Sequence, residues 1–135
     1  MNQTTRRKFI LWMASTPFFT SVLNKLTHAN LFKFQRFLLN RFTVAGFQYY
    51  SGKNIIHQLK GGDCLLLRAE PQNIYDEFAV EIFYEGHKLG YIPRSDNKHI
   101  SRLLRQDAKL CCEVFEVSPE SEPWAMLKVQ VFLNV

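Results

Sequence analysis

From Phe42 to the C-terminus, short apolar runs alternate with turn signals, and this alternation limits the possible folds more than any other feature. The runs have about six residues each and are rich in β-branched and aromatic types, which is typical of strands. Gly61-Gly62-Asp63 and Glu85-Gly86-His87 are tight connections, and the second predicts a hairpin. The predicted strands are 42–50, 64–70, 78–84, 88–92, 109–117 and 125–133.

One helix is expected between the fourth and fifth strands. Ser95 is a favourable N-cap, and Asp96 follows in the first turn. Ile100, Leu103 and Leu104 form its apolar face. Short strands with one helix predict an all-β domain, a small closed or nearly closed barrel, because closure protects the edges of the sheet. A two-layer α+β arrangement is the alternative.

The polar face of this helix carries four cations. Arg94, Lys98, Arg102 and Arg105 follow one another at spacings of four, four and three, which places them in one stripe. Such a stripe is either a solvated face or a surface that contacts phosphates.

The basic character of the chain is concentrated at its N-terminus. The 135 residues carry a net charge of +5, and residues 1–29 supply +4 of it, because they contain four basic and no acidic residues. Residues 30–135 hold the other 13 basic and all 12 acidic residues. The body of the protein is therefore near neutral, and it must bind any anion through a local patch. The length suits one domain and excludes a multi-domain enzyme.

Residues 1–29 have the layout of a secretory signal. A basic patch, Arg6-Arg7-Lys8, precedes a mildly apolar stretch from Phe9 to Leu23, and small residues at 27 and 29 predict cleavage after Ala29. Arg6-Arg7-Lys8-Phe9-Ile10 resembles the twin-arginine export motif, which implies recognition by the twin-arginine translocase. The expected location is the periplasm. An uncleaved anchor in the inner membrane and a cytoplasmic chain are the alternatives.

Residues 30–41 form a basic, amphipathic hinge before a domain expected at 42–135. Leu31, Phe34 and Leu38 fall on one side of a helical wheel, while Lys33 and Arg36 fall opposite. The segment could be a helix on a membrane surface or a linker that packs on the core, and its last residues could lead into the first strand.

No motif for catalysis or metal binding stands out. The three cysteines, Cys64, Cys111 and Cys112, are odd in number, and no pair has zinc-ligand spacing. No triad, paired carboxylates or glycine-rich phosphate loop is evident. We expect no cofactor, no metal and no enzymatic activity.

Three segments carry a family resemblance. They are V-A-G-F-Q-Y-Y-S-G at 44–52, P-Q-N-I-Y-D-E-F-A-V at 71–80, and G-Y-I-P at 90–93. In this order they resemble the HIRAN domain family, over about 42–133. The resemblance implies an OB-like β-barrel of about six strands. It also implies capture of the 3′ end of single-stranded DNA, the activity known for a vertebrate member.

The resemblance also implies site residues. Tyr49 and Tyr75 correspond to aromatic rings that stack on bases, and Asp76 to the carboxylate that accepts a hydrogen bond from the 3′-hydroxyl. Gln48 stands where the best-studied member has an arginine on phosphate, and Tyr91 stands where that member has a histidine.

The chemistry is coherent without the family. Aromatic rings stack on any base, and a carboxylate repels internal phosphates while it selects a terminal hydroxyl. The plainer interpretations are packing for Tyr49 and Tyr75 and a loop cap for Asp76. The predicted nucleic-acid-binding residues are Gln48, Tyr49, Tyr75, Asp76, Tyr91, Arg94, Lys98, Arg102 and Arg105.

The leading hypothesis is a monomeric module that binds the 3′ end of single-stranded DNA. Gln48 and the near-neutral body favour the alternative, a protein-interaction domain of the cell envelope that uses the same barrel without binding DNA.

Overall fold

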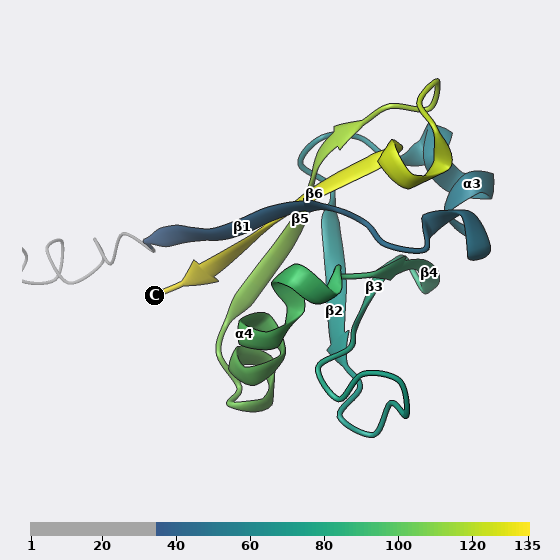
Figure 1. The fold of residues 1–135 in the computed structure, drawn as a ribbon. Helices are drawn as coiled ribbons and strands as arrows, with labels where there is room; N and C mark the ends of the chain where they lie inside the picture. The colour runs from purple at the N-terminus through teal and green to yellow at the C-terminus, as the bar shows by residue number, and fades with distance from the viewer. Residues whose placement is uncertain (1–34) are drawn as a thin grey trace, which may run out of the picture. The chain divides into compact units, whose positions relative to one another are not determined.

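The computed structural model of the chain describes residues 35–135 (Figure 1). The predicted signal at 1–29 and residues 30–34 of the predicted hinge lie outside the described residues. Within 35–135, none of the helices has the length and apolar character needed to cross a membrane.

The described part is a strongly bent antiparallel sheet with one longer helix, α4. Its strands follow the order β1-β6-β5-β2-β3-β4, and every neighbouring pair is antiparallel. In chain order the elements are β1 (Arg36–Thr43), η1 (Phe47–Tyr49), α3 (Gly52–Ile55), η2 (Ile56–Gln58), β2 (Cys64–Ala69), β3 (Val80–Tyr84), β4 (His87–Tyr91), α4 (Arg94–Arg105), β5 (Leu110–Val117), η3 (Pro123–Ala125) and β6 (Leu127–Asn134).

The two edge strands, β1 and β4, approach each other just beyond the end of β1. Ala45 and Tyr91 form an isolated bridge there, in which each N–H donates to the other carbonyl at 2.9 Å. The close approach requires Gly90, because a Cβ at this position would overlap the carbonyl oxygen of Ala45. The sheet is not closed along its whole length, but its barrel-like form confirms the expected OB-like, all-β fold.

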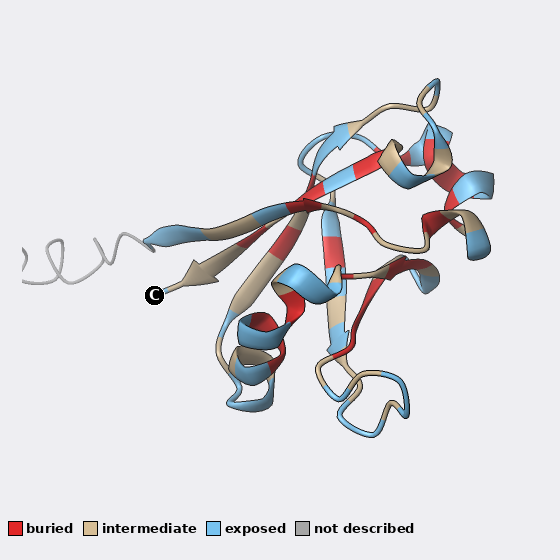
Figure 2. Ribbon diagram, viewed as in Figure 1, coloured by how far each residue is buried: buried red, intermediate tan, exposed pale blue. Residues whose placement is uncertain are grey.

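The core lies between the bent sheet and α4 (Figure 2). Alternate side chains of β6, such as Val129 and Val131, point inward and are fully buried. Ile100 of α4 is also fully buried, and Leu104 packs against this core from the next turn. The predicted apolar face of the helix therefore covers the sheet.

The region before β2 differs from the predicted strand at 42–50. Strand β1 begins at Arg36, so the last part of the predicted hinge is a strand paired with β6. The chain then leaves the sheet at Gly46, whose φ of 73° suits glycine and turns the chain into η1. The predicted strand is therefore wrong beyond Thr43, apart from the isolated bridge at Ala45.

The start of α4 also differs in detail. Arg94 is its first residue and Pro93 occupies the N-cap position, whereas Ser95 was the expected cap. Ser95 lies in the first turn, where its hydroxyl donates to Asp96. The hairpin between β3 and β4 is confirmed, because Tyr84 pairs with His87 across Glu85 and Gly86, which both have positive φ.

Candidate nucleic-acid interface

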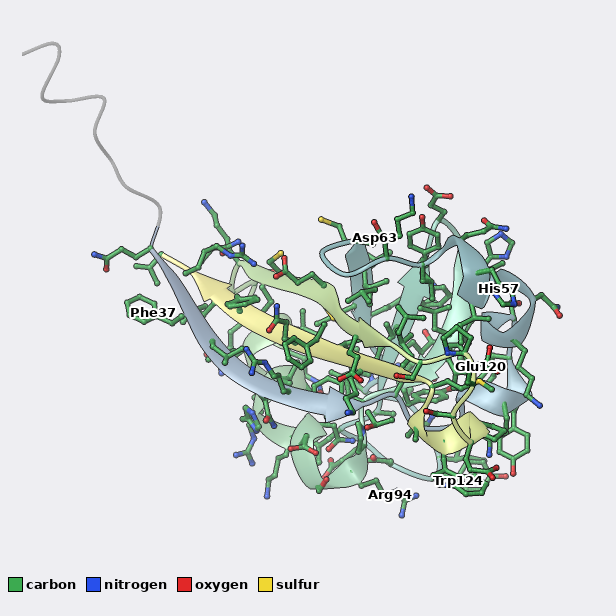
Figure 3. All side chains as sticks on the ribbon, turned by 90° about the horizontal axis from the view of Figure 1, so that it is seen from above. Phe37, His57, Asp63, Arg94, Glu120 and Trp124 are labelled. Atoms are coloured by element: carbon green, nitrogen blue, oxygen red, sulfur yellow. The ribbon has the colours of Figure 1, made fainter. Side chains whose placement is uncertain are left out.

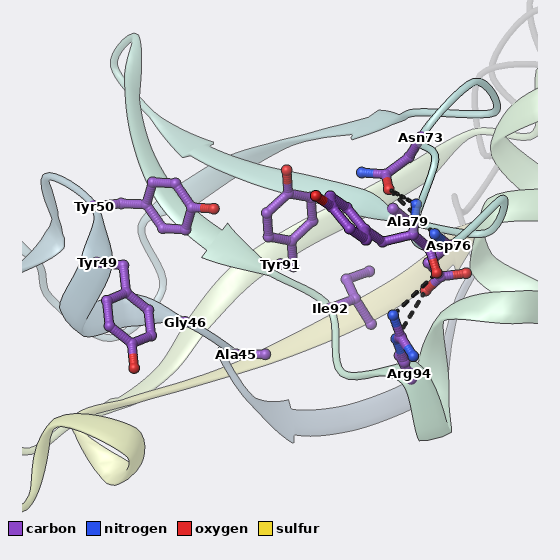
Figure 4. A pocket seen from close by; sticks show the side chains of 11 residues that line it. Ala45, Gly46, Tyr49, Tyr50, Asn73, Asp76, Ala79, Tyr91, Ile92 and Arg94 are labelled. Atoms are coloured by element: carbon purple, nitrogen blue, oxygen red, sulfur yellow. Dashed lines mark hydrogen bonds and ion pairs between the residues drawn. The ribbon is translucent and has the colours of Figure 1, made fainter.

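A cavity of about 470 Å³ lies where the three motif segments meet (Figure 4). Its lining comes from the chain after β1, from the loop between β2 and β3, and from the end of β4 with the start of α4. These segments are far apart in sequence, and the bridge between Ala45 and Tyr91 holds the first and third together.

The segment after β1 turns one aromatic ring inward and two outward. Phe47 is fully buried because Gly52 leaves room for its ring, which a Cβ at position 52 would overlap. The 3₁₀ turn that starts after Gly46 then directs Tyr49 outward, with 78% of its surface exposed, and Tyr50 is exposed beside it. Both tyrosines line the cavity, so packing in the barrel does not explain either one.

The loop between β2 and β3 is held by hydrogen bonds within itself. The side-chain oxygen of Asn73 accepts hydrogen bonds from the N–H groups of Tyr75 and Asp76, at 2.9 and 3.1 Å. Oδ1 of Asp76 accepts from the N–H of Phe78 at 2.9 Å. These turns leave the ring of Tyr75 80% exposed at the cavity.

The half-buried carboxylate of Asp76 has acceptor capacity to spare. Its Oδ2 accepts from Nδ2 of Asn97 at 2.7 Å and lies 3.8 Å from Nε of Arg94. A carboxylate has about four acceptor positions, and the hydrogen bonds from Phe78 and Asn97 occupy two of them, while Arg94 is too distant for a hydrogen bond. Asp76 therefore caps the loop, and it can also accept a hydrogen bond from one ligand hydroxyl.

A charged network lies behind the ring of Tyr91. Nζ of Lys88 donates to the hydroxyl of Tyr91 at 2.8 Å and pairs with Glu81 at 3.0 Å, and the Tyr91 hydroxyl donates to Glu70 at 3.0 Å. Burial would lower the pKa of Lys88, but its bonds to Tyr91 and Glu81 raise that pKa overall. Burial raises the pKa of Tyr91. The Tyr91 hydroxyl is thus engaged within the protein, and its ring is the part that a ligand can contact.

Lys88 also orders the neighbouring aromatic rings. Its ammonium group lies 4.5 Å from the ring centroid of Tyr50 and 4.2 Å from that of Tyr91. The two rings meet edge to face at 6.0 Å. This arrangement fixes one wall of the cavity.

The basic stripe of α4 divides into two parts. Arg94 lines the cavity, and its Nη2 donates to the carbonyl oxygen of Tyr75 at 3.0 Å. Lys98, Arg102 and Arg105 lie outside the cavity, where all three gather on the ring of Phe78 at 5.4 to 5.6 Å. Arg105 also donates to the backbone carbonyl of Glu77.

Gln48 does not line the cavity. It is half-buried, and its Oε1 is buried without a hydrogen-bond partner among the described residues. The structure therefore brings together Tyr49, Tyr75, Asp76, Tyr91 and Arg94 of the predicted set.

Two residues that line the cavity were not predicted as site residues. Tyr50 and Asn73 line it, and both stand in the motif segments. Trp124 of η3 is 63% exposed, and η3 packs against η1, the turn that ends at Tyr49. Figure 3 labels Trp124 of η3 and Arg94 at the start of α4, both on the surface of the domain. No local pattern marks Trp124, because its position depends on the pairing of β5 with β6.

Nothing in the described part of the chain forms a metal site, since no three His, Cys, Asp or Glu side chains gather there. The cysteines at 64, 111 and 112 are free thiols.

The family model of the HIRAN domain matches residues 39–135. The chain belongs to the HIRAN domain family. HIRAN domains are nucleic-acid-binding modules. The family match begins within β1, in agreement with a domain that starts before the predicted residue 42.

Two crystal structures are similar to this one. A protein from Lactobacillus plantarum, solved by the Northeast Structural Genomics Consortium, is 26% identical with a TM-score of 0.65, over 75% of this chain and 97% of that one. The HIRAN domain of human HLTF is 16% identical with a TM-score of 0.59, over 73% of this chain and 78% of that one, and it supports the fold alone. No curated protein matches the sequence.

Proposed function

We propose that the HIRAN barrel of this chain binds the 3′ end of single-stranded DNA in the cavity. The observation that carries the proposal is the exposed ring of Tyr75 next to a carboxylate, Asp76, that keeps a free acceptor position. Tyr75 and Tyr49 stack on bases, and Tyr91 contributes the face of its ring. Asp76 accepts the terminal hydroxyl and repels a phosphate at the same place.

The cations of α4 provide the phosphate contacts in this proposal. Arg94 lies at the cavity beside Asp76, and Lys98, Arg102 and Arg105 continue from it along the exposed face of the helix. These contacts are sequence-independent and weaken with salt, because they replace counterions on the phosphate backbone.

The test compares two short oligonucleotides that differ only in a 3′-hydroxyl or a 3′-phosphate. The full chain should prefer the hydroxyl end. The Asp76→Asn variant should lose this preference while it keeps much of its total affinity, because an amide still accepts a hydrogen bond but no longer repels phosphate. Asp107→Asn is the matched control, since Asp107 is exposed beyond α4 and the substitution removes the same charge. Equal binding of both ends by the unaltered chain rejects end recognition.

The second candidate is a protein-interaction domain of the cell envelope. It is favoured by the lining of the cavity, which contains a single cation, Arg94, close to the carboxylate of Asp76. A lack of binding to any oligonucleotide at low salt supports this candidate. The proposed location for either function is the periplasm or the inner membrane surface.

A further inference from the structure

Asn97 is a buried polar residue in the first turn of α4, outside the set predicted from the sequence. Its side chain is 2% exposed, and Nδ2 donates to Oδ2 of Asp76 at 2.7 Å. Ile100 and Ser101, which follow one turn later, are fully buried. The amide is therefore held on a rigid, well-packed element, as precise positioning of a functional group requires.

Arg94 is paired with Oδ2 of Asp76 by charge alone, at a distance too long for a hydrogen bond. Arg94 approaches with Nε at 3.8 Å, and its side chain is largely exposed, so water and salt screen the attraction. Oδ1 of Asp76 is held by the backbone of Phe78. The orientation of the carboxylate consequently depends on one short, buried contact from Asn97 and one backbone contact.

Arg94 competes with Asn97 for the same carboxylate. A guanidinium that moves closer can form two parallel hydrogen bonds to a carboxylate and use both of its oxygens. Such a pair occupies the acceptor position that a ligand hydroxyl needs, and it also withdraws Arg94 from phosphate. The bonds from Asn97 to Oδ2 and from Phe78 to Oδ1 disfavour this pair, because each already occupies an acceptor position on the oxygen that Arg94 would need.

We propose that Asn97 is the positioning residue that orients Asp76 to read a terminal hydroxyl and keeps Arg94 available for phosphate. This inference rests on the proposed function, since it assigns the residue on which end selection at the cavity depends. Asn97 itself touches no ligand.

The test uses the Asn97→Leu variant of the full chain, because leucine is similar in size and cannot donate a hydrogen bond. The preference for a 3′-hydroxyl over a 3′-phosphate oligonucleotide should fall by about tenfold, while binding through the tyrosines persists. Ser101→Ala is the matched control. It removes a buried hydroxyl from the same helix that has no hydrogen-bond partner within residues 35–135, and it should leave the preference unchanged.

The outcomes separate the two proposals. No preference in the unaltered chain overturns the proposed function and this inference together. A preference in the unaltered chain that survives in Asn97→Leu, or an equal loss of affinity for both ends, overturns the role of Asn97 alone.

A second measurement decides the matter if Asn97→Leu fails to fold. In the unaltered chain, the side-chain amide NMR signals of Asn97 should shift when the 3′-hydroxyl oligonucleotide binds. A new hydrogen bond from the terminal hydroxyl to the Asp76 carboxylate changes the strength of the bond that Asn97 donates to it. The 3′-phosphate oligonucleotide should leave them in place. Equal shifts with both, or none at saturation, contradict the inference.

Discussion

Tyr75 is held at the cavity through its backbone, which bonds to the side chains of Asn73 and Arg94, and its exposed ring contributes little to the packing of the domain. Tyr75→Ala should therefore cost about 1–3 kcal/mol of single-strand affinity, because one stacking surface is lost. Tyr75→Phe should cost little, since the ring remains. Fluorescence anisotropy measures the affinity of each variant, and thermal unfolding should show that both keep the stability of the unaltered chain. A drop in stability without a change in affinity contradicts a stacking role.

Gly90 is the residue on which closure of the barrel depends. Its φ is 148°, and a Cβ there would overlap the backbone of Ala45 and approach Val44. Gly90→Ala should therefore destabilise the fold by about 2 kcal/mol or more, because backbone strain and overpacking act together.

Gly86→Ala is the control for this prediction. Gly86 also has a positive φ, 81°, but no atom lies within 4 Å of a Cβ built there. Its cost should be about 1 kcal/mol, from strain alone. Urea unfolding compares the two, and equal losses contradict the importance of the contact between Gly90 and Ala45.

At the scale of the elements, strands β2 to β6 could be predicted closely because each is a short apolar run between turn residues. The extent of strand β1 could not be predicted from the sequence. The segment around it also fits a helical period, and its strand conformation is fixed by pairing with β6 at the other end of the chain. Residues 47–49 contain two aromatic rings and suit a strand locally, yet the turn at Gly46 takes them out of the sheet.

The residues of the candidate site also fall into two groups, those that a sequence motif predicts and those that only the packing of the elements brings to the site. Tyr75 and Asp76 could be predicted because one loop motif contains both. Asn97 could not, since it reaches Asp76 only through the packing of α4 against the loop between β2 and β3. For Gln48, a motif position alone did not indicate whether the side chain reaches the cavity.

The basic stripe is a property of α4 as a whole. Reversing Arg102 and Arg105 to Glu should weaken binding for every oligonucleotide sequence alike and reduce the dependence of affinity on salt, because phosphates carry no base information. Folding should survive, since exposed charges contribute little to stability. Titrations at several salt concentrations measure the slope.

Lys53 and Lys60 provide a matched control for the stripe, because both are exposed lysines outside α4. Reversing them to Glu changes the net charge by the same amount. If this pair reduces the salt slope and the α4 pair does not, the phosphates follow a path along Lys53 and Lys60 instead of α4.

At the scale of the whole molecule, the domain needs its full β1. A chain that begins at Thr43 lacks almost all of this strand and exposes the paired edge of β6. Binding assays therefore belong on the full chain, in which Ala45 and Tyr91 can hold the cavity together.

The last prediction concerns where this molecule acts. Arg6 and Arg7 stand in register with Phe9 and Ile10 as in a twin-arginine signal, a route that carries proteins already folded, and a small barrel suits this requirement. Changing both arginines to Lys should hold the full-length chain in the cytoplasm of a bacterial host, whereas Lys25→Gln, outside the paired run, should not. Fractionation followed by mass spectrometry of the N-terminus measures the outcome. If the double variant is still found in the periplasm as a chain that begins near Asn30, the protein does not use the twin-arginine route.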